Sequence, residues 1–370
     1  MSRSFGVSRV TGVCLTVVLV LAGSSLQSGS KQAASIPNQG PDNNYGVSGG
    51  NVNDISKRFC CSGTLGALVT DSANDYILSN NHVLADSDQG HVGDAVSQPG
   101  LVDVNCNAND ARTVGHLTAW PLLGTNVDAA LAQLVPGIMN TTGAIEGIAA
   151  LPSTTTRTPT IGLAVEKSGR TTAVTTGSVQ SVNASVSVRY PTSCGGHRTF
   201  RISYLNQVVV TPGSFSAAGD SGSLILTSDS ACPQPVALLF AGSSTVTIGN
   251  PINDVISKAG AALGTPITFV GQTCGSPAAR AGQGDSLRGQ LPGISELAVA
   301  NATMVMRTRE HQIMARPGVI GIGVGASAVN SSEAVIVVYV DSESGLTTPL
   351  PTRINGVRVE RIATDPFIAY

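Results

Sequence analysis

The sequence predicts a mostly β protein, in which a barrel of short strands is followed by a small C-terminal α+β module. Three observations support this prediction. Between about Cys60 and Val270, short β-branched runs alternate with Gly, Pro, Asn and Ser. Helical periodicity is rare in that stretch. After a second segment rich in Gly, Ser and Pro, the pattern changes to one helical stretch and a few strand-like runs.

Residues 1–25 are predicted to be a secretory signal peptide. Arg3 and Arg9 precede a short apolar run over residues 10–22, and small residues follow it. That run is shorter than the roughly 20 residues needed to span a membrane. We therefore expect a secreted, periplasmic or extracellular protein with no stable membrane span after cleavage; an uncleaved signal anchor is the alternative. Residues 26–55 are rich in Gly, Asn, Ser and Gln and are predicted to be a flexible lead-in.

Residues 56–270 are predicted to form the main β domain. About 210 residues are enough for two six-stranded barrels. The expected strands cover residues 65–69, 76–78, 129–134, 178–188, 207–210, 222–226 and 236–240.

Residues 271–295 are predicted to be a linker, and residues 296–370 the α+β module. A helix is expected over 296–315, with strands at 319–324, 334–340 and 357–362. Gly321, Gly323 and Gly325 resemble a dinucleotide-binding fingerprint. However, the third glycine is one position early and the following connection is too short for a crossover, so a hairpin is expected.

Composition and cysteine usage restrict the possible functions. The formal net charge of −2 provides no basic field, so nucleic acid is not an expected partner. Beyond Cys14 in the signal, six cysteines remain, and disulfides are expected in an exported chain. Sequence leaves all pairings open, except that the adjacent Cys60 and Cys61 are not expected to bond to each other. No cysteine–histidine spacing indicates a metal site, and no cofactor is expected.

The sharpest local signal is the stretch 215–223 (FSAAGDSGS). A serine nucleophile needs a base for its proton and backbone amides directed at the developing oxyanion. Glycines beside Ser221 allow a sharp turn in which the amides of Gly219 and Ser221 can point into one hollow. Ser221 is therefore the candidate nucleophile, and these two amides are the candidate oxyanion hole.

His82 and Asp128 are the candidate partners of Ser221. Among the five histidines, His82 alone follows an apolar strand-like run, where a barrel presents side chains to a cleft. Asp128 lies at the start of another apolar strand, where an unpaired carboxylate would be costly to bury. A buried carboxylate of this kind fixes the imidazole tautomer and stabilises the imidazolium. The order of His82, Asp128 and Ser221 in the chain is that of chymotrypsin.

With these motifs, the sequence resembles bacterial chymotrypsin-fold serine proteases of the trypsin-like superfamily, from about Cys61 to Lys258. The matching segments are 78–83 (LSNNHV), 127–130 (VDAA), 167–172 (KSGRTT), 215–223 and 239–242 (LFAG). The resemblance implies a chymotrypsin-like double β-barrel with the triad between the barrels. It also implies hydrolysis of protein or peptide substrates through an acyl-enzyme, without a cofactor. By position, Phe240, Ala241 and Gly242 would pair with substrate, while Phe215 and Ser216 would form the base of the specificity pocket.

The sequence departs from this family's pattern in three places. No activation site of the Ile-Val-Gly-Gly type precedes the barrel, so Asp220 would need another cation, either Lys167 or Arg170. Phe240 occupies the position of a serine that commonly supports the catalytic aspartate. No acid stands at the pocket base, so cleavage after Lys or Arg is not expected.

Three functions are compatible with these residues. The first is a serine endopeptidase. The second is a chymotrypsin-fold binding protein or adhesin with little activity, and the third is an esterase using the same triad. The C-terminal module carries no nucleophile, so we expect it to bind or regulate, with an intramolecular contact to the protease domain as one form of regulation.

Overall fold

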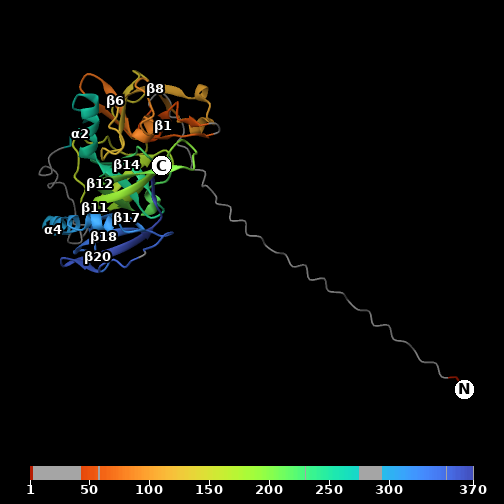
Figure 1. Ribbon diagram of the computed structural model, residues 1–370. Helices are drawn as coiled ribbons and strands as arrows, with labels where there is room; N and C mark the ends of the chain where they lie inside the picture. The colour runs from red at the N-terminus through yellow and green to blue at the C-terminus, as the bar shows by residue number, and fades with distance from the viewer. Residues whose placement is uncertain (3–42, 57–58, 230, 275–293, 347, 370) are drawn as a thin grey trace. The chain divides into compact units, whose positions relative to one another are not determined.

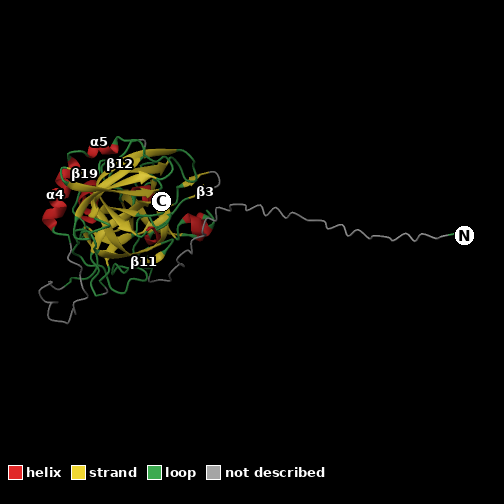
Figure 2. Ribbon diagram, turned by 90° about the horizontal axis from the view of Figure 1, so that it is seen from below, coloured by secondary structure: helices red, strands yellow, loops and turns green. Residues whose placement is uncertain are grey.

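The computed structural model describes residues 1–2, 43–56, 59–229, 231–274, 294–346 and 348–369. Residues 3–25 of the predicted signal peptide, residues 26–42 of the predicted lead-in and most of the predicted linker lie outside these residues. Two large curled sheets, of eight and eleven strands, dominate residues 43–369, and helices occupy only their margins (Figure 2). The predicted mostly β, chymotrypsin-like double-barrel architecture is confirmed. No helix among the described residues is long and apolar enough to cross a membrane.

The first sheet carries the N-terminal half of the candidate site (Figure 1). Its apolar side chains form one buried cluster, which includes Leu68, Ile77, Val114 and Leu131. In sheet order its strands are β16 (Thr268–Phe269), β5 (Ala67–Thr70), β6 (Asp75–Ser79), β9 (Ala130–Leu134), β8 (Arg112–Ala119), β7 (Ala95–Gln98), β1 (Val47–Asn51) and β4 (Gly63–Leu65).

Strand β1 corrects the expected lead-in. Residues 47–51 were predicted to be part of a flexible segment, but they are fully buried and pair with β4 and β7. The glycines in this strand remove the β-branched pattern by which a strand is predicted, and the packing of the strand requires them. A Cβ at Gly49 would overlap the side chain of Leu65, so the usual β-branched signature is absent here.

The second sheet carries the turn with the candidate nucleophile Ser221 and the strand expected to pair with substrate. Its core contains Val165, Val210, Phe215 and Ile225. The barrel strands are β10 (Ala164–Gly169), β11 (Ala173–Pro191), β12 (Thr199–Thr211), β13 (Leu224–Thr227), β14 (Pro235–Gly242) and β15 (Thr247–Pro251). Strands β11 and β12 form a long hairpin, and the small pair β2 (Ile55–Ser56) and β3 (Phe59–Cys60) lies outside both sheets.

The C-terminal residues form the predicted elements but do not form a sheet of their own. Strand β17 (Val319–Ala326) pairs with β11, so the second sheet continues through β18 (Ala334–Asp341), β20 (Val357–Thr364) and β19 (Arg353–Ile354). Strands β17 and β18 are the expected antiparallel hairpin. A last strand, β21 (Phe367–Ala369), pairs with both β11 and β14. The region expected to be a separate module therefore shares its sheet with the second barrel.

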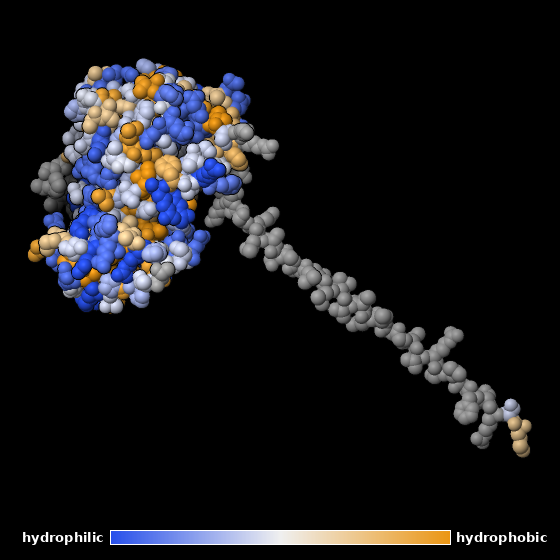
Figure 3. Space-filling view, in the orientation of Figure 1, coloured by the Kyte–Doolittle hydropathy of each residue, from blue (hydrophilic) through white to orange (hydrophobic). Residues whose placement is uncertain are grey.

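The helices are short and lie at the margins of the sheets. Helix α4 begins after Ser295, whose side chain accepts a hydrogen bond from the Ala298 amide, and the chain continues into α5. The outer surface in Figure 3 mixes hydrophilic residues with small hydrophobic patches. The helices are α1 (Asn81–Leu84), α2 (Ile252–Leu263), α4 (Glu296–Arg307) and α5 (Glu310–Met314), with 3₁₀ turns at Leu101–Val104, Ala108–Asp110 and Gly213–Phe215.

The six cysteines outside the predicted signal form three disulfides: Cys60–Cys106, Cys61–Cys194 and Cys232–Cys274. As expected, Cys60 and Cys61 do not bond to each other. Cys194 lies in the turn between β11 and β12, so its disulfide ties the tip of that hairpin to the segment that precedes β4.

Candidate active site

Sheet register brings His82 and Asp128 together. Strands β6 and β9 pair antiparallel with Ser79 opposite Ala130, so the residues after β6 lie beside those before β9. The chain then turns into the short helix α1, which carries His82. The Asn80 side chain donates to the Asp128 carbonyl at 2.7 Å and holds the two segments at this spacing.

The carboxylate of Asp128 is fully buried and orients the imidazole of His82. Its Oδ2 lies 2.6 Å from His82 Nδ1, and its Oδ1 accepts the His82 backbone amide at 3.2 Å. Asn250 fixes the position of the acid, because its Oδ1 accepts the Asp128 amide at 2.9 Å. When Nδ1 carries the proton that Asp128 accepts, the lone pair of the imidazole is on Nε2, which is the tautomer that a general base needs.

A third donor to Asp128, which the sequence analysis missed, is Tyr190. Its hydroxyl donates to Asp128 Oδ2 at 2.8 Å and lies 2.7 Å from the hydroxyl of Tyr204. Burial, followed by the nearby Asp128 charge, raises the pKa of Tyr190 well above its usual value, so this phenol stays protonated and donates. Its ring also lies edge-on to His82, with centroids 5.9 Å apart. Tyr190 thus contacts both the carboxylate of Asp128 and the imidazole of His82.

The turn before β13 presents Ser221. Gly219 and Gly222 adopt positive φ angles of +98° and +92°, which L side chains rarely adopt. Among the described residues, neither the Gly219 nor the Ser221 amide donates to an acceptor, whereas the Asp220 and Gly222 amides bond to the carbonyls of Ala217 and Leu239. The arrangement therefore fits two amides directed at a ligand.

The hydroxyl of Ser221 points toward β14 in this structure. It donates to the Phe240 carbonyl at 3.3 Å and makes no hydrogen bond to His82. The two residues nevertheless belong to neighbouring segments: a Cβ on Gly63 would contact both Val83, next to His82, and the carbonyl of Ser221. Hydrogen bonds between nucleophile and base are often long or misaligned without substrate, so this orientation does not exclude Ser221 as the nucleophile.

Asp220 finds its cation in Lys167. The Lys167 ammonium lies 3.5 Å from Asp220 Oδ2, and both side chains are fully buried. Backbone amides of Thr171, Thr172 and Ala217 also donate to this carboxylate. Of the two candidates, Lys167 is therefore confirmed, whereas Arg170 pairs with Asp103 at 2.7 Å.

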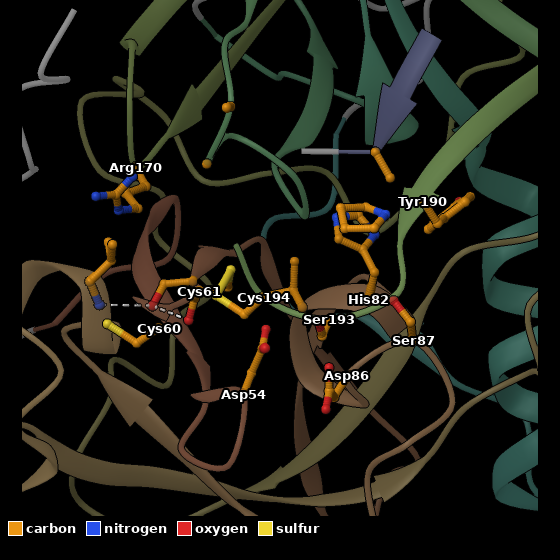
Figure 4. Close-up of a pocket in the computed structure, with 17 residues that line it drawn as sticks. Asp54, Cys60, Cys61, His82, Asp86, Ser87, Arg170, Tyr190, Ser193 and Cys194 are labelled. Carbon is orange, nitrogen blue, oxygen red and sulfur yellow. Dashed lines mark hydrogen bonds between the residues drawn. A yellow bond between two sulfur atoms is a disulfide. The ribbon is translucent and has the colours of Figure 1, made fainter. Parts of the chain in front are cut away.

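A cavity of about 240 Å³ opens between His82 and the Gly219 turn. In Figure 4, His82 and Tyr190 lie on one side, Arg170 on the other, and Asp54 and Asp86 below them. Burial, with a further contribution from the Asp86 charge, raises the pKa of Asp54 to about 7. The floor of the cavity therefore contains a carboxyl group that ionises near neutral pH.

One cluster of potential metal ligands lies at the edge of this cavity, formed by Asp54, Cys61 and Cys194. The two sulfur atoms are joined to each other in a disulfide, so they are not thiolate ligands. The cluster therefore does not provide a set of ligands for a metal ion.

The five predicted substrate-contact residues occupy two environments. Phe215 is fully buried in the core of the second barrel, and Ser216 bonds to Thr247; neither lines the cavity beside His82. Phe240, Ala241 and Gly242 form the end of β14, as the sequence predicted for a pairing strand. Of the same turn, Ala218 and Gly219 line that cavity.

No family model and no curated protein matches the chain, but solved structures do. The chain is similar to bacterial serine proteases of the chymotrypsin fold. A glutamic-acid-specific serine protease is 21% identical, with a TM-score of 0.42, over 61% of this chain and 98% of its own. Cellulomonas bogoriensis chymotrypsin is 16% identical, with a TM-score of 0.40, over 62% and 100%. Thermobifida fusca protease A is 17% identical, with a TM-score of 0.38, over 57% and 92%. These likenesses concern the fold, so the function is argued from the site.

Proposed function

We propose that the protein is a serine endopeptidase in which Ser221 is the nucleophile, His82 the general base and Asp128 the residue that orients the base. The observation that carries this proposal is the 2.6 Å contact between His82 Nδ1 and a fully buried Asp128, at a cavity that is also lined by Gly219, two residues before Ser221. A carboxylate buried against an imidazole at the edge of a cavity is an arrangement suited to proton transfer.

The geometry supports an acyl-enzyme mechanism. Ser221 Oγ attacks the carbonyl carbon of the scissile bond while its proton passes to His82 Nε2, and Asp128 stabilises the imidazolium that forms. The Gly219 and Ser221 amides bind the oxyanion. Collapse of the tetrahedral intermediate expels the amine, which takes the proton from His82. Water then attacks the acyl-enzyme ester while His82 accepts its proton, and His82 returns that proton to Ser221 Oγ as the acid product leaves.

A fluorophosphonate probe tests this proposal, because Ser221 Oγ displaces its fluoride to form a stable phosphonate ester. The native protein should be labelled and should cleave a denatured protein, whereas Ser221→Ala should lose about 10⁴-fold or more of both activities. Ser193→Ala is the matched control, since Ser193 lines the same cavity.

The outcomes separate the three hypotheses. Labelling without cleavage of a denatured protein indicates an esterase. A folded protein that is neither labelled nor active on protein substrates indicates a binding protein and contradicts the proposal, as would a Ser221→Ala variant that retains normal turnover.

A further inference from the structure

The edge of β14 next to Ser221 is occupied by the chain's own C-terminal strand. Strand β13 pairs with β14 only from Leu224 onward, opposite Leu238, and leaves the end of β14 beyond it without this neighbour. There β21 takes over, with Ala369 opposite Ala241 and Ile368 opposite Gly242. This is the edge at which a peptide substrate is expected to pair.

Strand β21 runs antiparallel to β14 toward the turn that carries Ser221, which is the direction expected of a bound peptide substrate. The pairing is antiparallel, and the step from Ile368 to Ala369 follows β14 from Gly242 to Ala241. Strand β14 continues from Ala241 to Phe240, whose carbonyl accepts the Ser221 hydroxyl. Tyr370 itself lies outside the described residues. Ala369 lines the same cavity as His82 and Tyr190, and in Figure 4 the blue arrow of the C-terminal strand ends beside them.

Phe367 anchors this strand. Its side chain is fully buried and its ring lies 5.7 Å from that of Tyr339, in the cluster that joins the C-terminal strands to the second barrel. The second edge of β21 pairs in parallel with β11, where Val188 is opposite Phe367. Strand β21 is therefore held between β11 and β14 rather than attached along one edge only.

A polar clamp fixes the segment immediately before β21. The Asp365 carboxylate accepts the Ser244 amide at 3.1 Å and the Ser244 hydroxyl at 2.7 Å. Thr364 exchanges side-chain hydrogen bonds with Ser243 and Thr245 at 2.7 and 2.6 Å. These contacts bind the chain to the turn between β14 and β15, directly beside the substrate-pairing edge.

We propose that residues 367–369 act as an intramolecular peptide ligand of the β14 edge and keep the active site closed. The inference rests on the proposed function. The edge has one set of backbone donors and acceptors, so it pairs either with β21 or with an extended peptide, not with both. A tethered segment also competes at a high effective concentration. Removal or displacement of β21 is then the step that opens the site to substrate.

The first test is a protein that lacks residues 366–370. Deletion of all of 296–370 would remove β17, the partner of β11, so the shorter cut isolates β21. Hydrolysis of a denatured protein should rise about tenfold or more, because a 1.4 kcal/mol preference for the closed state leaves only about a tenth of the molecules open. Fluorophosphonate labelling reports in parallel whether the Ser221 site is intact.

A point variant covers the case in which loss of Phe367 prevents folding. Ile368→Pro keeps the Phe367 anchor but removes a backbone donor and restricts φ to about −65°, which is poorly compatible with a paired strand. Ile368→Ala is its matched control, because it keeps the amide, and the Ile368 side chain is exposed. Ile368→Pro should hydrolyse substrate faster than the native protein, and Ile368→Ala at the native rate.

A binding measurement separates failure of this inference from failure of the proposed function. A fluorescein-labelled peptide of residues 365–370 should bind the shortened protein, as measured by anisotropy, but neither the full chain nor Ile368→Ala. A scrambled peptide should bind none of them. Binding of the peptide supports the intramolecular ligand even if no form of the protein is labelled, an outcome that would reject the protease.

Two results would overturn the inference. One is equal hydrolysis by the native protein, the shortened protein and Ile368→Pro while all three react with the probe, which leaves the proposed function intact. The other is a folded shortened protein that binds the peptide and the scrambled peptide equally weakly.

Discussion

Asp128 and Asp220 are both fully buried carboxylates, one before a strand of each barrel, yet different partners satisfy them. Asp220 lies 3.5 Å from the Lys167 ammonium and accepts three backbone amides. Asp128 accepts from His82 and from the neutral hydroxyl of Tyr190. In the described part of the chain, no Lys or Arg forms an ion pair with Asp128.

This difference separates a structural acid from one that can take part in chemistry. The charge of Asp220 is matched by a fixed cation, so the turn beneath Gly219 and Ser221 is held in one arrangement. The charge of Asp128 is matched fully only when His82 becomes an imidazolium. A site that stabilises a transient cation needs a carboxylate of the second kind. Two variants test this contrast, and a third tests the acid in the cavity floor.

The largest effect is expected from Lys167→Met, which leaves the Asp220 carboxylate buried without its cation. Loss of one partner of a buried ion pair costs about 3–5 kcal/mol, so the melting temperature should fall and the Ser221 turn should lose its activity. Denaturant unfolding measures the effect, with Arg358→Met, at a half-buried ion pair, as control. Unchanged stability would show that the backbone amides alone hold Asp220.

A smaller effect is expected from Tyr190→Phe, which removes one donor from Asp128. A hydrogen bond to a charged group contributes about 1.5–3 kcal/mol, so kcat should fall about 10- to 100-fold while KM changes little. Tyr204→Phe is the control, because it leaves the contact between Tyr190 and Asp128 in place. Equal losses of kcat in both variants would mean that Tyr190 acts through packing alone.

The third effect concerns the cavity floor and is read from a pH dependence. Because the pKa of Asp54 is raised to about 7 in the folded protein from 3.8, folding keeps a proton on this group that the unfolded chain releases. Stability should therefore decline as pH rises from about 4 to about 7 and then level off. Asp54→Asn should flatten this decline in melting temperature with pH, whereas Asp110→Asn, at an exposed site, serves as the control and should not. An unaltered slope in Asp54→Asn would show that the decline does not arise from Asp54.

The sequence was most informative where a motif is local. The segments around His82, Asp128 and Ser221 each carry their own signature, and the barrel strands follow β-branched runs that a short window detects. Choosing between Lys167 and Arg170 as the partner of Asp220 required the structure. Both lie in the segment 167–172, and the sequence does not show which of the two side chains points toward Asp220.

The features that the sequence analysis missed depend on contacts between distant residues. Strand β1 is rich in glycine, and the feature that explains its glycines is the side chain of Leu65 packed against it, which is a contact between residues distant in the sequence. Tyr190 lies 62 residues from Asp128. Tyr190 and Tyr204 lie on the two strands of the β11–β12 hairpin, which the sequence analysis did not predict. The pairing of β17 with β11 has no local signature at all, so the C-terminal strands could be predicted but not their sheet.

The continuous second sheet has a consequence for the order of events during folding. Hydroxyl groups of Ser181 and Tyr339 meet across 158 residues of sequence, whereas β11 and β12 form a local hairpin. Contacts of such high sequence separation form late, since loop-closure entropy must be overcome first. The β11–β12 hairpin is therefore expected to form before β17 and β21 dock. During this interval the β14 edge of a newly made molecule is open. The extended peptides closest to it are then segments of other molecules of the same protein that have not yet folded.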